Sequence, residues 1–240
     1  MRVSRTHAVA DGLLASVLDG TFPPSSSLPS EADLAARFGV SRLTVREAIR
    51  SLASTNVIEV QHGKSSVINP PEKWSPLDPR LLQARGQVSG QPGLLPRKLI
   101  EARRTLEIGV AELAAGRRTA EHLERLAGQI DAMRDAHERA EVDRFVEADL
   151  AFHHTLFEIV DNAFLDAVFE PLAEVVRSLR STTSTIESHR EHAIAWHDRI
   201  LAAVAGNDGD AAREAMRAHL IQTENDSDEF LTEPGPTVTV

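Results

Sequence analysis

The chain has 240 residues, of which 42% are hydrophobic, so it can form one or two domains with packed cores. It has no cysteine, which excludes disulfides, thiolate metal sites and thiol-based redox sensing. The net charge of −10 is unfavourable for nucleic-acid binding, but residues 1–69 carry seven Lys/Arg and six Asp/Glu, whereas the rest carries 19 and 30. An apolar signal region and an apolar run of membrane-spanning length are both missing, so we expect a cytoplasmic protein without a membrane partner.

Two short helices joined by a sharp turn are predicted in the stretch 28–68, after a first helix over residues 7–19. The expected inward side chains of the first helix are Val9, Leu13, Leu14, Val17 and Leu18. Ser30 is a good N-cap and is followed by carboxylates in the first helical turn. Gly39 suits the left-handed position after a helix, and Ser41 can cap the next helix. The inner face of that next helix is Val45, Ala48, Ile49 and Leu52.

The outer face of the second of these two helices carries side chains suited to DNA. They are Arg42, Thr44, Arg46 and Arg50. Arginine donates to phosphates and binds guanine through two hydrogen bonds. A hairpin is predicted next, with strands at 57–60 and 67–68 and a basic tip of His62, Gly63 and Lys64 that suits the DNA backbone or minor groove. The pattern favours a winged helix-turn-helix; the alternative is a generic helical element with a solvated basic face.

Four short motifs stand out in this stretch: Leu28-Pro29-Ser30-Glu31, Gly39-Val40-Ser41-Arg42, Val45-Arg46-Glu47-Ala48 and His62-Gly63-Lys64. Together they resemble the DNA-binding domain of the GntR family of bacterial transcription regulators. The resemblance implies DNA contacts from Ser41, Arg42, Thr44, Arg46, His62 and Gly63. Arg50 and Lys64 are also expected to contact DNA, because Arg50 lies on the same helix face and Lys64 at the hairpin tip. Ala32 stands where family members commonly have arginine, and Ser65 where a second wing glycine is usual, so operator sequence or affinity should differ.

A linker is predicted over residues 70–96, which are rich in Pro, Gly and Gln. A short helix near 78–85 is expected within it. Trp74 and Leu77 are expected to pack this linker onto one of the domains.

Residues 97–230 show helical spacing of apolar residues almost throughout, and no strand-like alternation. One expected inward stripe is Leu99, Leu106, Val110 and Leu113. This pattern favours an antiparallel bundle of six or seven helices. The fold class is therefore mainly α: a winged helix-turn-helix with a small β-hairpin wing over residues 1–69, then an all-α antiparallel bundle. Residues 231–240 are expected to be a disordered tail.

Residues 97–230 contain one aspartate and three histidines at spacings that can bring their side chains together. Asp149 and His153 are four residues apart and share a helix face. His197 lies nine residues before the turn at 206–210, and His219 lies nine residues after it. In two antiparallel helices joined by that turn, both histidines are about 13 Å from it at about 1.5 Å per residue. One carboxylate and three imidazoles could thus converge, a set that suits zinc, nickel, manganese or iron with positions left for a ligand.

Asp210, at the end of this turn, is expected to cap the last helix. Each histidine could instead be a satisfied core or surface residue. His154 points about 100° away from His153 on an ideal helix and is not an expected ligand. The other histidines are expected at the surface: His7, His122, His137, His189 and His192.

The sequence around these positions contains Asp149, Phe152, His153 and Leu156 in an Asp-x-x-Phe-His-x-x-Leu pattern. With His197 and His219, it resembles the FCD ligand-binding domain of the FadR-type branch of the GntR family. The resemblance implies a divalent metal, with zinc favoured, and a small organic acid that completes its coordination. The segment 101–107 resembles the one whose arginine meets the effector carboxylate, which implies this role for Arg103; the alternative is a surface arginine paired with Glu107.

The favoured function is a ligand-responsive repressor of a carbon-catabolism operon. We expect a homodimer on a palindromic double-stranded DNA operator, with a sugar acid or hydroxy acid as effector. One alternative is a metalloenzyme with an appended DNA-binding domain, although no dedicated nucleophile or general base is apparent beyond the ligands. Another is a DNA binder whose metal is purely structural.

Overall fold

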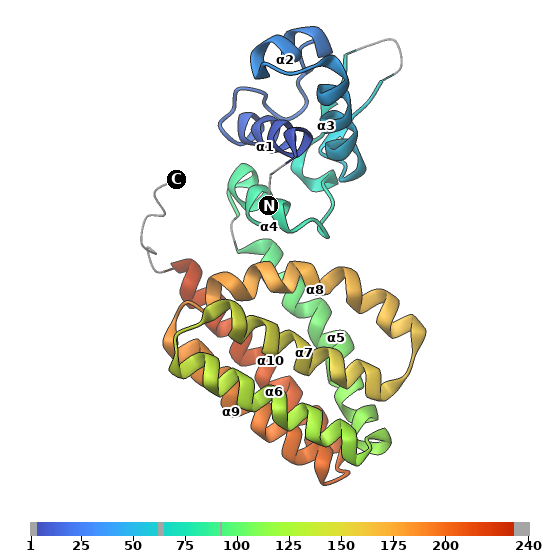
Figure 1. Ribbon diagram of the computed structural model, residues 1–240, viewed down its shortest axis with the longest axis vertical. Helices are drawn as coiled ribbons and strands as arrows, with labels where there is room; N and C mark the ends of the chain where they lie inside the picture. The colour runs from blue at the N-terminus through green and yellow to red at the C-terminus, as the bar shows by residue number, and fades with distance from the viewer. Residues whose placement is uncertain (1–3, 62–64, 92, 233–240) are drawn as a thin grey trace. The chain divides into compact units, whose positions relative to one another are not determined.

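The chain divides into two compact units, Met1–Pro92 and Gly93–Val240. The computed structural model describes residues 4–61, 65–91 and 93–232. Figure 1 shows the helices of the N-terminal unit and the long helices of the C-terminal unit. Within the described ranges, no helix is long and apolar enough to span a lipid bilayer.

The N-terminal unit begins with three helices, α1 (Arg5–Leu18), α2 (Glu31–Phe38) and α3 (Arg42–Ser54). The side chains of Ser30 and Ser41 accept hydrogen bonds from the backbone N–H groups of Asp33 and Thr44, which confirms both predicted caps. Gly39 ends α2 with φ of 64°, in the left-handed region that glycine adopts without a steric penalty.

A short antiparallel hairpin follows α3, formed by β1 (Ile58–Glu59) and β2 (Val67–Ile68). Ile58 pairs with Ile68, and Glu59 with Val67. The first predicted strand was too long, because Val60 lies outside β1 and is exposed. The predicted wing tip at 62–64 lies outside the described residues. Three helices and a hairpin in this order form a winged helix-turn-helix.

The segment predicted as a linker is largely structured and belongs to the N-terminal unit up to Pro92. It contains a 3₁₀ turn, η1 (Pro71–Lys73), and α4 (Pro79–Ser89), a longer helix than expected. Trp74 is buried in the N-terminal core, and its indole N–H donates to the carbonyl of Asn69 at 2.8 Å. Leu77 is exposed, so its predicted packing was wrong. Leu18 is also exposed, since it occupies the last turn of α1.

The C-terminal unit is an antiparallel bundle of long helices, as Figure 1 shows. Their bounds are α5 (Leu94–Arg117), α6 (Ala120–Glu138), α7 (Val142–Val160), α8 (Ala163–Thr183), α9 (Glu187–Ala205) and α10 (Gly209–Thr232). The closest neighbours are α5 with α10, α6 with α7, and α9 with α10. Helix α10 includes residues 231–232, which were predicted to be disordered; residues 233–240 lie outside the described part.

Side chains from all the bundle helices meet in one apolar core, and α7 contributes Phe145, Phe152, Leu156 and Phe157. Leu113 is exposed, so one member of the predicted α5 stripe was wrong. The predicted cap of the last helix was also wrong. Asp208, rather than Asp210, accepts a hydrogen bond from the backbone N–H of Ala211, because α10 begins at Gly209. This bundle core surrounds the polar cluster described next.

Candidate metal centre and DNA-binding surface

Three histidines from three helices meet inside the bundle. His153 comes from α7, His197 from α9 and His219 from α10, and all three are buried. Each offers a ring nitrogen, and these three nitrogens lie within 4.8 Å of one another. The connection between α9 and α10 is short, so residues at equal distances from it along the two helices lie side by side. His197 and His219 are such a pair, as their spacing in the sequence predicted.

Asp149 lies one helical turn before His153 and is fully buried. Its Oδ1 is 3.5 Å from Nε2 of His197. Asp149 is not part of the mutually close set of three imidazoles, and Nη2 of Arg180 lies 3.2 Å from the same oxygen. Burial works against ionisation, but the positive charge of Arg180 outweighs it, so the pKa of Asp149 is lowered and the carboxylate is charged.

The orientation of His197 leaves a lone pair directed into the site. Its Nδ1 lies 2.6 Å from the carbonyl oxygen of Ala193, which can only accept, so Nδ1 carries the proton and Nε2 is free to bind a ligand. Burial lowers the pKa of His197 to about 3 and holds that of His219 well below its usual value. Both rings are therefore neutral at pH 7, the state that metal binding requires.

Two polar atoms in this cluster are buried without a hydrogen-bond partner: Oδ2 of Asp149 and Nε2 of His197. Buried acceptors left without partners are costly unless something else satisfies them. A carboxylate and imidazole nitrogens are ligands that zinc, nickel, manganese and iron accept. The donor atoms present here therefore fit a divalent metal.

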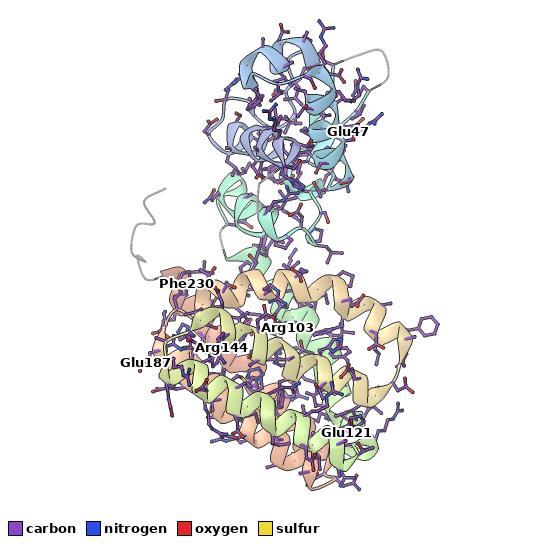
Figure 2. All side chains as sticks on the ribbon, in the orientation of Figure 1. Glu47, Arg103, Glu121, Arg144, Glu187 and Phe230 are labelled. Atoms are coloured by element: carbon purple, nitrogen blue, oxygen red, sulfur yellow. The ribbon has the colours of Figure 1, made fainter. Side chains whose placement is uncertain are left out.

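Arg103, on α5, is labelled within the C-terminal unit in Figure 2. It is buried beside this cluster, with only 2% of its surface exposed. Its Nη2 is 3.4 Å from Nε2 of His153. It also pairs with Glu107, with Nε to Oε1 at 2.6 Å, so the predicted pairing with Glu107 occurs, but inside the bundle rather than on the surface. Burial raises the pKa of Glu107, but Arg103 and His153 lower it more, to about 2.

Two charged residues of this cluster were missed from the sequence: Glu107 as a site residue and Arg180 altogether. Oε2 of Glu107 lies 2.7 Å from Nδ1 of His153. Arg180, from α8, has its Nη2 3.5 Å from Nε2 of His219 and is buried. A signal was available, because Arg180 follows Val176 and Leu179 at helical spacing, on a face that is otherwise apolar.

The remaining histidines are placed differently. His154 is exposed, as expected from its angle on α7, and so is His7. His122, His137 and His192 are half-buried. His189 is fully buried, so its predicted surface position was wrong, because the first turns of α9 pack against α10.

The predicted DNA-binding residues of α3 lie along one face of the N-terminal unit. Ser41, Arg42, Arg46 and Arg50 are exposed, and Thr44 is half-buried. Arg46 forms two hydrogen bonds with Glu31 of α2, from Nε at 2.9 Å and from Nη2 at 2.6 Å. Arg50 pairs with Glu47 at 2.8 Å on the same helix. His62, Gly63 and Lys64 lie outside the described residues.

Comparisons with known proteins agree with both parts of the molecule. Residues 5–68 match the gntR family of bacterial regulatory proteins, and residues 98–222 match the FCD domain. The HTH-type transcriptional regulator LutR of Bacillus subtilis is 32% identical over 222 residues, which are 87% of this chain and 94% of LutR. The galactonate operon transcriptional repressor of Escherichia coli is 27% identical over 216 residues, which are 90% of this chain and 93% of that protein.

Two solved structures share the fold. The Listeria monocytogenes protein Lar, described as controlling the agr system, has a TM-score of 0.68 at 17% identity, over 95% of this chain and 99% of that chain. Escherichia coli McbR/YncC has a TM-score of 0.55 at 20% identity, over 96% and 100%. The matched families and these curated relatives are transcriptional regulators, which rules out the metalloenzyme alternative. The chain belongs to the gntR family of bacterial regulatory proteins and is a DNA-binding transcriptional regulator with a C-terminal FCD domain.

Proposed function

We propose that this regulator is a repressor that binds its operator as a homodimer and is released by a small carboxylic acid. The exposed Ser41, Arg42, Arg46 and Arg50, with Thr44, support insertion of α3 into the major groove. Two copies would place two such helices on successive grooves of a palindromic operator. The wing tip, His62, Gly63 and Lys64, would contact the neighbouring backbone or minor groove.

We also propose that Asp149, His153, His197 and His219 hold a divalent ion, with zinc favoured. The observation that supports this is that ring nitrogens of the three buried histidines lie within 4.8 Å of one another, while Nε2 of His197 and Oδ2 of Asp149 are buried without a hydrogen-bond partner. Such an ion would supply a Lewis-acid anchor for one oxygen of the effector. The complete ligand set is present in this chain, which favours a metal that takes part in effector binding.

The effector is proposed to be a sugar acid or hydroxy acid. Arg103 and Arg180 place two buried guanidinium groups against the histidine cluster, and guanidinium is the side chain that best recognises a carboxylate. A buried site with two cations and polar acceptors suits a polyhydroxylated anion better than an apolar chain. The galactonate operon repressor, a relative at 27% identity, is named for a sugar acid.

The test is operator binding by the zinc-loaded protein, followed by fluorescence anisotropy on DNA from upstream of its own gene. A panel of sugar acids and hydroxy acids is titrated in, with and without a chelator. We expect one acid to release the DNA, and the release to be lost after chelation. If the acid binds the conformation that releases DNA about 100-fold more tightly than the conformation that binds DNA, the difference is about 2.7 kcal/mol. That is enough to shift most of the protein to the releasing conformation.

Two arginine variants make this test specific. Arg103→Gln leaves the carboxylate of Glu107 buried without its partner, so circular dichroism must first show that the variant is folded. The folded variant should bind the operator normally but lose the response to the acid. Arg104→Gln, at the next position of α5, removes an arginine that is half-exposed and pairs with Glu224, so it should respond like the parent protein. Tight DNA binding that no acid and no chelator alters would refute the sensor and favour a structural metal.

A further inference from the structure

A second cluster of metal-binding side chains lies on the same helix pair as the first, but toward the start of α9 and the end of α10. It consists of His189, Asp226 and Glu229, whose donor atoms lie within 4.8 Å of one another. Nε2 of His189 is 3.9 Å from Oδ1 of Asp226 and 3.7 Å from Oε2 of Glu229. His189 and Asp226 are buried, and Glu229 is exposed. This cluster is separate from the residues proposed above to hold the effector metal.

The ring of His189 is oriented as a metal ligand would be. Its Nδ1 lies 3.0 Å from the carbonyl oxygen of Thr183, at the end of α8, so Nδ1 must be the protonated nitrogen. Nε2 then carries the lone pair, faces the two carboxylates and has no hydrogen-bond partner in a fully buried position. A backbone carbonyl that fixes the tautomer of a ligating histidine is a usual feature of metal sites. His197 shows the same arrangement with Ala193 in the first cluster.

The charge balance of the cluster also favours a cation. Asp226 is buried, and among the described residues no arginine or lysine lies within ion-pair distance of it. Its Oδ1 accepts a hydrogen bond from the amide of Gln222 at 2.8 Å and lies 3.1 Å from Nδ1 of His192. The amide of Gln222 is neutral, so among the described residues only the imidazoles of His189 and His192 lie within ion-pair distance of this carboxylate. A bound cation would supply a full positive charge, which a buried carboxylate needs.

We propose that His189, Asp226 and Glu229 form a second site for a divalent transition-metal ion. His189 lies eight residues before His197 on α9, so the two sites are about 12 Å apart along the helix at about 1.5 Å per residue. One imidazole and two carboxylates form a harder donor set than three imidazoles and one carboxylate, and Glu229 leaves one side open to solvent. The second ion therefore binds more weakly than the first and links the start of α9 to the end of α10.

The test uses full-length protein stripped of metal and zinc ions alone as the probe. In a His153→Ala, His219→Ala background, calorimetry should still find one equivalent of bound zinc. Adding Glu229→Gln to this background should weaken that binding at least tenfold, and His189→Gln should abolish it. Glu214→Gln, an exposed carboxylate on the same helix, is the matched control and should leave the affinity unchanged.

Because His189 is buried, its replacement can unfold the bundle, so circular dichroism is recorded for each protein. If His189→Gln is misfolded, the result for Glu229→Gln, at the exposed position, decides the test. Absence of zinc binding by the folded background protein would overturn the proposal. So would an affinity unaffected by Glu229→Gln, or one lowered equally by Glu214→Gln. None of these readouts involves DNA or the effector, so the second site and the proposed sensor function can fail separately.

Discussion

Replacing Glu107 with glutamine should strongly destabilise the C-terminal unit. Glu107 is buried against Arg103, whose guanidinium is 2% exposed and 2.6 Å from the carboxylate. Glutamine has nearly the same shape but no charge, so the guanidinium is left buried without a carboxylate partner. Breaking a buried pair in this way costs about 3–5 kcal/mol. For a unit of this size, that lowers the melting temperature by on the order of 10 °C.

The assay is thermal unfolding followed by circular dichroism in the presence of a chelator, so that bound metal adds no stability. Glu112→Gln, on the same helix, is the control, because Glu112 and its partner Arg213 are both about half exposed. It should cost less than about 1 kcal/mol. A double variant, Arg103→Met with Glu107→Leu, removes both buried charges and should recover most of the lost stability. Equal destabilisation by Glu107→Gln and Glu112→Gln would refute the reasoning.

Three further predictions test the two units separately. Arg46→Ala should weaken operator binding roughly ten- to hundredfold in anisotropy measurements if Arg46 contacts a base, with effector affinity unchanged; unchanged DNA affinity would remove Arg46 from the interface. His153→Ala should lower the metal content by one equivalent and abolish the effector response while sparing DNA binding by the free protein; unaltered stoichiometry would exclude His153 as a ligand. Trp74→Ala should cost about 3–5 kcal/mol in the N-terminal unit without changing metal affinity, since Trp74 is fully buried there; a loss below about 1 kcal/mol would contradict its place in that core.

Local sequence signals predicted the elements of the N-terminal unit well. Ser30, Gly39 and Ser41 specify the ends of α2 and α3 because capping depends on a side chain and the backbone within three residues of it. The same locality explains an error: Asp208 and Asp210 are both good capping residues, and only the path of the turn selects Asp208. Trp74 and Leu77 are both apolar, and the sequence did not show that only Trp74 reaches the core.

The histidine cluster was partly predictable because of helix geometry. The i, i+4 spacing of Asp149 and His153 and the equal distances of His197 and His219 from one turn are properties of the chain itself. Arg180 could not be placed in this way, because it comes from α8 and reaches the cluster through its long side chain. Its contact with Asp149 depends on how α8 packs on α7.

The sequence by itself determined which residues form helices, where those helices are capped, and which polar residues share a face, because these are short-range properties of a polypeptide. Only the tertiary structure decided which of those polar faces are buried. His189 was predicted to be a surface residue, and the alternative interpretation of Arg103 was a surface pair with Glu107, yet all three side chains are buried in the bundle. Burial depends on contacts between helices distant in sequence, and it turns ordinary charged side chains into a cluster of desolvated, mutually dependent groups.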